Sequence, residues 1–436
     1  MKIVVIGGGI AGLYAALQLS GVHDITLLDN RKYVGGRIHT HTRPHYEVGA
    51  ARFHGHHVLL QKLIRKYHLR AVRVDSAAAY YDSRALAYVD GSFDRFEACI
   101  KTVLQRSTTY SSGELRSMTF KELCKRLQTD VHVDDLIRIF GYRCEFEYMN
   151  AYDACRTFQT DFVAQQYYML ASGLSELCER MARDVCRKGG RIRLEEQVEA
   201  VTRRGAEICV TSQHGDYVGD DVIFAIKPHQ MMQFSILRPV RPYLSKVRAG
   251  KLLRIYAKFP LRMNGPWFAG MKKTTTDSFL RQIIPVSENQ GLIMISYTDG
   301  ADVDFFLRKG RVRSDVQEVV MKECRRLFGR IPEPTYFKAH YWSEGCHYWR
   351  PDANSGVISR RLIHPAPNIY TCGEGFSTKQ AWMEGALETA AEVVQRLCRG
   401  CADRRICAAR AMPRRSCYNS RPSYARWGVG GSSWTT

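Results

Sequence analysis

Six residues near the N-terminus have the types and the spacing of a phosphate-binding turn. The stretch from Gly7 to Gly12 reads GGGIAG and matches the pattern G-x-G-x-x-G. In such a turn Gly7 permits the tight bend, Gly9 lets the backbone approach a pyrophosphate, and Gly12 lets the following helix pack closely on its strand. The free N–H groups and the positive end of that helix then face the phosphates. The stretch therefore predicts a dinucleotide site.

An acid and an arginine follow where such a site requires them. Asp29 stands about 20 residues beyond the turn, where a carboxylate accepts hydrogen bonds from ribose hydroxyl groups. The segment Val34-Gly35-Gly36-Arg37 comes next, and an arginine after paired glycines can place its guanidinium against a pyrophosphate. The turn alone does not separate NAD from FAD, but these residues strengthen the prediction of a dinucleotide cofactor.

Strands and helices in a regular order would position these groups. Lys2–Ile6 reads as a strand, about Ile10–Ser20 as a helix, and a second strand ends at Asp29. Much later, an apolar strand at Val222–Ile226 precedes the strand of NIYTCGE and a helix at about Gln380–Arg396. Strands that alternate with helices predict a parallel α/β sheet, here assembled from distant parts of the chain.

Composition places the chain among globular proteins. Of its 436 residues 45% are hydrophobic and 11% aromatic, and no run approaches about 18 apolar residues, so we expect no membrane span. The 14 cysteines stand singly, as in reduced intracellular proteins, and we expect a cytoplasmic location. Six histidines lie between His39 and His57, but no repeated ligand spacing accompanies them, so we expect no metal site.

The net charge of +21 predicts attraction to anionic partners such as nucleic acid, phosphorylated ligands or acidic surfaces. Part of this charge is local, because residues 399–436 contain eight arginines and a single acidic residue. These residues show little apolar periodicity and read as a basic, flexible tail. Such a tail could make the protein soluble, or it could act as an electrostatic tether.

The order of these motifs resembles the flavin-containing amine oxidases, which include monoamine and polyamine oxidases, L-amino-acid oxidases and histone lysine demethylases. The similar features are the glycine-rich turn, the acid, the GGR segment and YEVGAARFHG from Tyr46 to Gly55. The resemblance runs in pieces across most of residues 1–396. It implies FAD as the cofactor and an α/β fold, in which a Rossmann-like, glutathione-reductase-type FAD-binding domain carries an inserted α+β substrate domain.

The resemblance also assigns residues to the FAD. Asp29 would hold the adenosine ribose, Gly36-Arg37 would lie along the pyrophosphate and flavin, and Gly49-Ala50 would approach the isoalloxazine ring. Val198, in the segment EEQVEAV, would meet the adenine through its backbone. The cofactor residues that we expect from the first 200 positions are Gly7, Gly9, Ile10, Ala11, Gly12, Asp29, Asn30, Gly35, Gly36, Arg37, Gly49, Ala50, Ala51, Arg52 and Val198.

A second glycine–acid cluster, YTCGEGFSTKQAWMEGALETAA, spans Tyr370–Ala391. In the family that it resembles, Gly373-Glu374 bring a carboxylate to the ribityl chain, and the backbone N–H groups of Met383–Ala386 face the pyrimidine edge of the flavin. A helix N-terminus there would stabilise the negative charge of reduced flavin. We therefore expect Gly373, Glu374, Met383 and Ala386 to complete the cofactor set.

The resemblance also indicates which residues meet the substrate. Trp382 would be one aromatic wall that orients an amine, and the segment WSEGCHYWRP from Trp342 to Pro351 would supply the other. Lys251 resembles a lysine that holds a water against flavin N5, with Lys258 as an alternative. The candidate catalytic residues are Lys251, Trp382, His347 and Tyr348.

One cysteine raises a separate question. Cys346 lies near the position where monoamine oxidases attach flavin through a thioether. Many members of the family bind flavin without a covalent bond, so a buried, inert thiol is the alternative.

These assignments predict a discontinuous FAD-binding domain of residues 1–70, 172–230 and 340–398, and a substrate domain of residues 71–171 and 231–339. The function that they imply is hydride transfer from the carbon next to an amine nitrogen to flavin N5, followed by imine hydrolysis and reoxidation by O₂ to H₂O₂. The partners would be a small-molecule amine and O₂, with the oligomeric state open. Alternatives are an FAD oxidase or desaturase of a non-amine substrate, and a basic protein that retains FAD without turnover.

Overall fold

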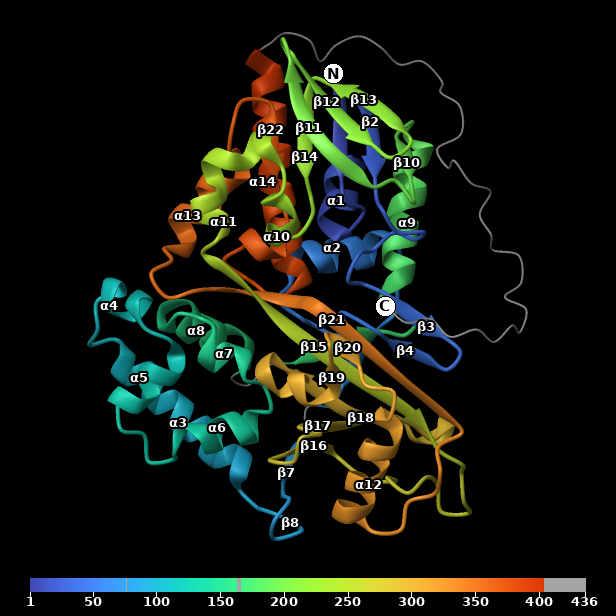
Figure 1. Cartoon of the computed structure of the whole chain (residues 1–436), viewed down its shortest axis with the longest axis vertical. Helices are drawn as coiled ribbons and strands as arrows, with labels where there is room; N and C mark the ends of the chain where they lie inside the picture. The colour runs from blue at the N-terminus through green and yellow to red at the C-terminus, as the bar shows by residue number, and fades with distance from the viewer. Residues whose placement is uncertain (76, 163–165, 404–436) are drawn as a thin grey trace.

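The computed structural model describes residues 1–75, 77–162 and 166–403. The elements form two lobes (Figure 1). A parallel sheet with its helices occupies the upper lobe, and a large sheet with many short helices occupies the lower one. The long strands β15 (Val247–Lys258) and β21 (Tyr336–Trp349) cross the middle of the molecule and connect the two.

The parallel sheet has five strands drawn from distant parts of the sequence. Every neighbouring pair is parallel. The three long strands in the centre are almost continuous runs of buried apolar residues, as expected for a sheet that is covered on both faces. In spatial order the strands are β10 (Arg191–Arg193), β2 (Asp24–Leu28), β1 (Lys2–Ile6), β14 (Asp221–Phe224) and β22 (Ile369–Thr371).

The alternation of side chains along β1 builds two cores. Ile3 and Val5 pack against the helices α1 (Ile10–Leu19), α9 (Leu174–Arg187) and α14 (Met383–Asp403). Val4 and Ile6 point the other way, because successive strand residues face opposite sides of a sheet. They pack against a three-stranded antiparallel sheet made of β11 (Val198–Arg204), β12 (Glu207–Ser212) and β13 (Gly215–Gly219).

The lower lobe is organised by a seven-stranded sheet. Its order is β21, β15, β18 (Leu292–Asp299), β17 (Gln282–Ser287), β16 (Lys273–Thr276), β7 (Ala78–Asp82) and β8 (Ala87–Tyr88). Helix α12 (Val316–Phe328) packs on this sheet through an amphipathic face that includes Val320 and Cys324. Residues of β15 and β18 that point away from α12 are available to line the space between the lobes.

A group of short helices lies beside this sheet and has its own aromatic core, which includes Phe120, Phe146 and Phe158. Segment η1 (Phe158–Phe162) is a π-helix, a form that often occurs at functional sites. The helices of the group are α3 (Ser92–Ser107), α4 (Ser112–Ser117), α5 (Phe120–Arg126), α6 (Val133–Phe140), α7 (Cys144–Glu147) and α8 (Ala151–Thr157).

Short elements complete the two lobes. The strands are β3 (Thr40–Thr42), β4 (His45–Glu47), β5 (Phe53–His54), β6 (Ala71–Val74), β9 (Tyr167–Leu170), β19 (Leu307–Arg308) and β20 (Arg311–Val312). The helices are α2 (Val58–Lys66), α10 (Pro228–Met231), η2 (Ser235–Val240), α11 (Arg241–Leu244), η3 (Glu288–Gln290), η4 (Gly300–Phe306), α13 (Ser355–Ile363) and η5 (Glu374–Phe376).

The predicted α/β class is confirmed, and the first strand has the predicted bounds. Strand β2 ends at Leu28 rather than Asp29, and the last helix begins at Met383 rather than Gln380. That helix continues to Asp403, five residues beyond the predicted domain boundary at 398. The rest of the predicted basic tail, residues 404–436, lies outside the described residues. No helix among the described residues is long and apolar enough to cross a membrane.

Candidate functional site

A cavity of about 850 Å³ lies between the two lobes and is lined by residues from both. Most residues assigned to the cofactor from the sequence meet there, although some stand more than 300 positions apart. Those that line the cavity are Gly7, Gly9, Ile10, Ala11, Asp29, Asn30, Gly35, Gly36, Arg37, Gly49, Ala50, Ala51, Arg52, Gly373, Glu374, Met383 and Ala386. Gly12 and Val198 do not line it.

The glycine-rich turn leaves a space in which phosphates fit. A Cβ atom added to Gly9 would have no neighbour within 4 Å, although Gly9 sits at the N-terminus of α1 and faces the cavity. The other two glycines are required by packing. A Cβ atom on Gly12 would lie 2.0 Å from the carbonyl oxygen of Gly7, and Gly7 itself has φ of +109°. The turn therefore offers an open cradle beside the free N–H groups of a helix, which suits a pyrophosphate.

Asp29 is held at the edge of the same cradle. Its carboxylate accepts hydrogen bonds from the backbone N–H of Gly8 at 2.6 Å and of Arg31 at 2.8 Å. The side chain lines the cavity and is 8% exposed. Burial raises the pKa of Asp29, and the two backbone hydrogen bonds oppose that change. The orientation of the carboxylate is thus fixed by the turn itself, which fits the ribose contact expected from the sequence.

Arg37 and Glu374 form an ion pair between residues that are far apart in the sequence. The Nη2 atom of Arg37 donates to Glu374 at 2.7 Å, and its Nη1 atom donates to the carbonyl oxygen of Gly345 at 2.9 Å. Glu374 also accepts from the backbone N–H groups of His347 and Ala381, at 2.9 and 3.0 Å. Although burial alone would raise it, Arg37 and His347 hold the pKa of Glu374 well below its usual value.

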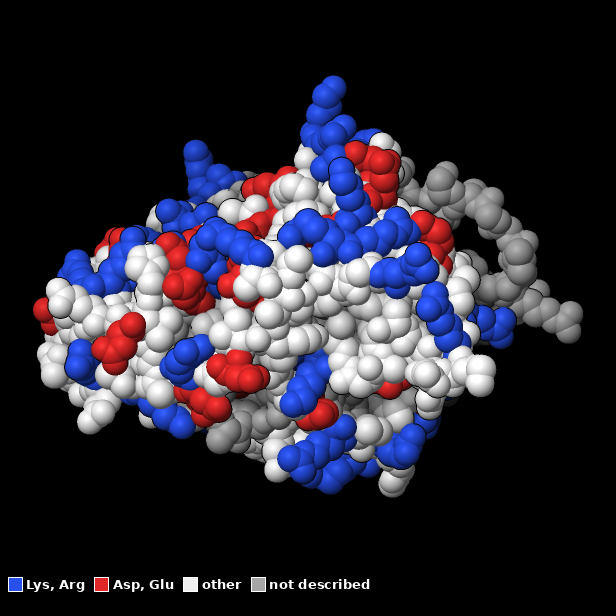
Figure 2. Space-filling model, turned by 90° about the horizontal axis from the view of Figure 1, so that it is seen from below, with Lys and Arg blue, Asp and Glu red and all other residues white. Residues whose placement is uncertain are grey.

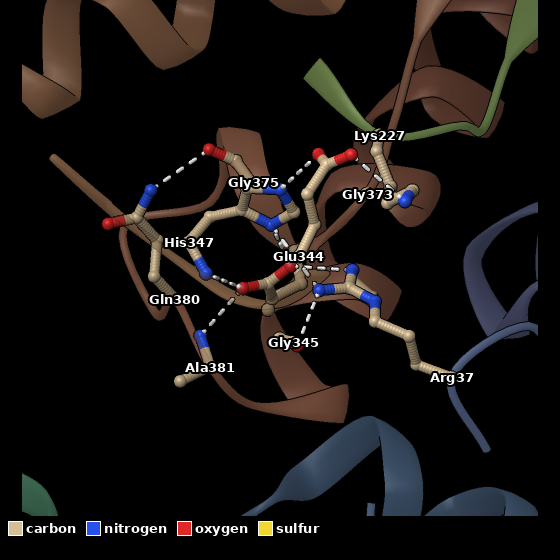
Figure 3. Close-up of polar contacts among 12 residues, drawn as sticks. Arg37, Lys227, Glu344, Gly345, His347, Gly373, Gly375, Gln380 and Ala381 are labelled. Carbon is tan, nitrogen blue, oxygen red and sulfur yellow. Dashed lines mark hydrogen bonds and ion pairs between the residues drawn. The ribbon is translucent and has the colours of Figure 1, made fainter. Parts of the chain in front are cut away.

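His347 lies behind this pair and does not line the cavity. It is 1% exposed, and its Nδ1 atom lies 2.8 Å from the Glu374 carboxylate. On its other side the Nε2 atom lies 3.7 Å from Glu344, which also pairs with Lys227 (Figure 3). The prediction that His347 forms an aromatic wall therefore does not fit its placement. It supports Glu374, and the adjacent residue Tyr348 lines the cavity instead.

Trp382 lines the cavity and is fixed by a hydrogen bond from its indole. The Nε1 atom donates to the carboxylate of Asp161 in η1 at 2.6 Å. Two histidines pack against the ring, with centroid distances of 4.6 Å for His54 and 5.2 Å for His57. Burial lowers the pKa of both imidazoles to about 3, so both are neutral at physiological pH. The histidine-rich segment thus supports an aromatic wall. No cluster of metal ligands occurs within the described ranges.

Strand β21 contributes Trp342, Gly345, Cys346 and Tyr348 to the cavity lining. Trp342 donates from its indole N–H to the carbonyl oxygen of Val48 at 3.2 Å. Cys346 and Tyr348 lie farther along the strand and also line the cavity. Burial raises the pKa of the Cys346 thiol to about 12, so it is protonated at neutral pH. The aromatic residues Trp382 and Tyr348 therefore both border the same cavity.

Lys251 does not fit its predicted place near the flavin. A β-bulge between Gly250 and Leu252 takes Lys251 out of the regular alternation of β15. Its Nζ atom donates to Asp304 at 2.6 Å, its side chain is 42% exposed, and it does not line the cavity. Lys258, the alternative, does not line it either. The cation that β15 directs to the cavity is Arg254, two residues beyond Leu252.

Arg254 is one of several lining residues that the sequence did not indicate. It is 8% exposed, donates to the carbonyl oxygen of Gly49, and lies 4.6 Å from the centroid of the Tyr297 ring. It therefore braces the segment expected beside the isoalloxazine ring. Alternation along β15 is the signal that could have located it, but the bulge shifts that alternation by one residue. Other lining residues that the sequence did not indicate are Tyr142, Met149, Thr157, Leu252 and Tyr297.

Two charged side chains face the remaining part of the cavity. Arg52 donates to the hydroxyl of Tyr142 at 3.3 Å and lies 4.4 Å from the centroid of the Tyr167 ring. Within the described ranges no carboxylate lies within 4 Å of its guanidinium. Glu145, in α7, also lines the cavity and is 8% exposed. This end of the cavity therefore contains aromatic surface, a guanidinium and a carboxyl group that do not form an ion pair with each other.

Comparison with known proteins identifies the group to which this arrangement belongs. The family model described as "Flavin containing amine oxidoreductase" matches residues 10–398. A flavin-dependent L-tryptophan oxidase of Lentzea aerocolonigenes is 25% identical, over 90% of this chain and 97% of its own length. Polyamine oxidase 4 of Oryza sativa subsp. japonica is 22% identical, over 86% of this chain and 84% of its own length.

A solved structure shows the same fold. The putative protoporphyrinogen oxidase of Exiguobacterium sp. 255-15 superposes with a TM-score of 0.68 at 16% identity, and the match covers 91% of this chain and 98% of the other. The open cradle at Gly9, the oriented carboxylate of Asp29 and the ion pair between Arg37 and the buried Glu374 suit the flavin that the family model specifies. The chain therefore belongs to the flavin-containing amine oxidoreductase family and is an oxidoreductase with FAD as its cofactor.

Proposed function

We propose that this enzyme oxidises the bond between nitrogen and carbon in a primary amine that also carries a carboxylate. The observation that supports this proposal is the single cavity, which begins at the phosphate cradle of Gly9 and ends between aromatic rings and the unpaired guanidinium of Arg52. FAD, when bound, accepts a hydride from the carbon next to the nitrogen and passes two electrons to O₂, which leaves as H₂O₂. Water then hydrolyses the imine to a carbonyl compound and ammonia.

The residues of this chain would orient the substrate and keep water away. Trp382 and Tyr348 offer flat apolar surfaces that position the reacting carbon and exclude solvent from it. Their contribution is geometric, and no catalytic triad is needed for a hydride transfer. Aromatic rings near a cationic amine add about 0.5–2 kcal/mol of binding free energy.

Arg52 favours a carboxylate on the substrate. The guanidinium of Arg52 is only partly exposed to water, and such a group has a cost of desolvation that an accompanying anion offsets. Arg52 has no such partner among the described residues, so a substrate carboxylate would complete its hydrogen bonds in the bidentate geometry that arginine prefers. The similar protein from Lentzea aerocolonigenes is named for an amino-acid substrate, and this supports the same choice.

The positive charge of the protein also favours a substrate that carries a carboxylate. Arg70 and Arg73 line the cavity and are exposed, so they lie where it opens to solvent. Figure 2 shows one face of the protein on which lysines and arginines clearly outnumber acidic residues. A positive field of this kind attracts anionic substrates and repels polycationic polyamines, whereas a zwitterion, which has no net charge, is not repelled. Binding of nucleic acid to this surface remains a prediction from the sequence.

An anaerobic spectroscopic experiment tests the proposal. The purified yellow protein is mixed with L-amino acids and with the amines that correspond to their decarboxylation, such as L-tryptophan and tryptamine. We expect the amino acids to bleach the flavin at least tenfold faster than the matched amines. Arg52→Met should abolish this preference. If no amine bleaches the flavin but a porphyrinogen does, the non-amine alternative is established.

A further inference from the structure

Glu145 is a buried carboxyl group with one oxygen that has no partner. It belongs to α7 (Cys144–Glu147) in the lower lobe, lines the cavity and is 8% exposed. Its Oε1 atom accepts a long hydrogen bond of 3.4 Å from the hydroxyl of Tyr348. Its Oε2 atom is buried and has no hydrogen-bond partner among the described residues. Because an unsatisfied buried carboxyl destabilises a protein, a partner that enters the cavity is expected.

The other acidic residues of this region are already satisfied. Glu147, on the same short helix, pairs with Lys121 at 3.0 Å and with Arg143 at 2.9 Å. Asp153 accepts hydrogen bonds from Asn150, Arg156 and Ser355. Of these three carboxylates, only that of Glu145 faces the cavity. The free oxygen is therefore a property of this position and not of the acidic segment in general.

The groups around Glu145 keep it uncharged when no cation is present. Asp299 lies close by; burial raises its pKa, and the backbone hydrogen bonds that it accepts from Arg143 and Cys144 oppose that change. Burial and then the charge of Asp299 raise the pKa of Glu145 to about 8.

The remaining groups that face Glu145 have small or opposite effects. Arg52 and the hydroxyl of Tyr348 lower its pKa. The thiols of Cys144 and Cys346 have raised pKa values and are neutral. Glu145 is therefore ready to ionise when a positive group arrives.

Arg52 and Glu145 together have the charges of a receptor for a zwitterion. Arg52 is close enough to affect the ionisation of Glu145, yet no ion pair within 4 Å joins them. The space between a guanidinium and a carboxyl group that ionises when a cation arrives suits a molecule that has an ammonium group beside a carboxylate. Tyr348 lies on the same wall and would place the substrate's carbon between these two contacts.

We propose that Glu145 binds the ammonium group of the substrate and accepts the proton that this group must lose before oxidation. This inference rests on the proposed function. As the ammonium group of R–CH(COO⁻)–NH₃⁺ binds, Glu145 releases its own proton to water. In the step, an N–H bond of the ammonium group then breaks, its electron pair stays on nitrogen, and the proton forms an O–H bond with the carboxylate of Glu145. The neutral amine would then have a lone pair ready to form the C=N bond when its carbon loses a hydride, for which FAD would be the acceptor. Glu145 keeps the proton when the product departs, which restores its uncharged state.

A binding experiment isolates the ammonium contact without turnover. The holoenzyme is titrated with α-methyl derivatives of tryptophan, phenylalanine and leucine, which lack the hydrogen that is removed, and with the corresponding acids that lack the amino group. Perturbation of the flavin absorbance reports binding. We expect Glu145→Gln to bind the α-methyl amino acids at least tenfold more weakly than the wild-type protein does. Its affinity for the acids without an amino group should stay within twofold of the wild-type value. Glu147→Gln, on the same helix, is the matched control and should change neither.

The pH dependence of anaerobic flavin bleaching tests the proton transfer. General-base catalysis contributes about 10²–10⁴-fold, so Glu145→Gln should slow bleaching about 100-fold at pH 7. The rate should recover as pH rises, because free amine then enters without help. Glu145→Asp, which keeps the base, should restore part of the rate at pH 7.

Two results would overturn the inference. One is that wild-type protein binds no α-methyl amino acid more tightly than its analogue without the amino group. The other is that Glu145→Gln changes neither binding nor bleaching by more than twofold. In both cases bleaching of the wild-type flavin by amino acids would still support the proposed function, whereas the absence of bleaching by any amine would contradict that function itself.

Discussion

Glu374 and Glu145 line the same cavity with nearly the same burial, 6% and 8% exposed, but their protonation states are opposite. Arg37 and His347 keep Glu374 ionised, and four hydrogen bonds satisfy its oxygens. Glu145 has one long hydrogen bond, which lowers its pKa only in part, whereas burial and the neighbouring Asp299 raise that pKa to about 8. At similar burial, the neighbouring charges and hydrogen bonds therefore determine whether a carboxyl group is ionised.

The difference separates two parts of the site. Around Glu374 the protein supplies every partner, so the cofactor end is complete in the folded chain. Around Glu145 and Arg52 the partners are missing from the described residues, so the substrate end is completed by what binds there. The distinction predicts that changes at the first end alter flavin content or stability, and that changes at the second end alter turnover.

The largest effect should come from filling the phosphate cradle. Gly9→Val adds a side chain where no protein atom lies within 4 Å, so the fold should persist while the pyrophosphate is excluded. We expect purified protein that has lost more than about 90% of its flavin absorbance, with an unchanged far-ultraviolet circular dichroism spectrum. Gly113→Val, at an exposed glycine in α4, is the control and should remain yellow. Normal flavin content in Gly9→Val would contradict the placement of the cofactor.

The next effect should appear at the substrate end. The Trp382→Ala variant should keep its flavin, but its kcat/KM for the best amine should fall about tenfold, because one aromatic wall of the cavity is lost. Asp161→Asn should have a smaller effect, since the amide oxygen can still accept the hydrogen bond from the indole. In a double-mutant cycle with Trp382→Phe, which lacks the indole N–H, the two changes should be non-additive. Unchanged kinetics in Trp382→Ala would show that Trp382 does not contact the substrate.

The two glutamates should also differ in how they link stability to pH. The pKa of Glu374 is lower in the folded state, so its pair with Arg37 stabilises the protein above pH 4.5 and the benefit is lost as pH falls. Glu374→Gln should therefore lower the free energy of unfolding by about 3 kcal/mol at pH 7, and by less near pH 4.

The pKa of Glu145 is higher in the folded state, so its effect on stability changes with pH in the opposite direction. Wild-type protein should lose stability relative to Glu145→Gln as pH rises from 5 to 8, by on the order of 2 kcal/mol. Urea unfolding at several pH values measures both differences. Parallel pH dependences for the two variants would show that the two environments are not distinct.

The smallest effect concerns Cys346. Because burial raises the pKa of this thiol to about 12, little thiolate is available to form a thioether with flavin. We expect acid precipitation to release all the flavin into the supernatant, and Cys346→Ala to keep its normal flavin content. A precipitate that stays yellow, with a protein mass increased by that of FAD, would show a covalent bond.

Much of the cofactor end could be predicted from the sequence because its geometry is local. Gly7, Gly9 and Gly12 act through backbone conformation, which the residue type itself restricts. The substrate end was harder to predict. The bulge in β15 leaves Arg254 and not Lys251 in the cavity lining, and of the two adjacent candidates on β21 only Tyr348 lines the cavity, whereas His347 does not. In a strand, a shift of one residue reverses the side to which a side chain points.

The sequence by itself determined the α/β class, the phosphate cradle and the family, because these depend on short motifs and on the periodicity of apolar residues. The tertiary structure decided which charges lack partners. Glu145, Glu147 and Asp153 are alike in the sequence, and only the packing of α7 against β18 and β21 directs Glu145 into the cavity beside Asp299 and Tyr348. Electrostatic interactions depend on distance in space and on the polarity of the surroundings, and neither is encoded in local sequence.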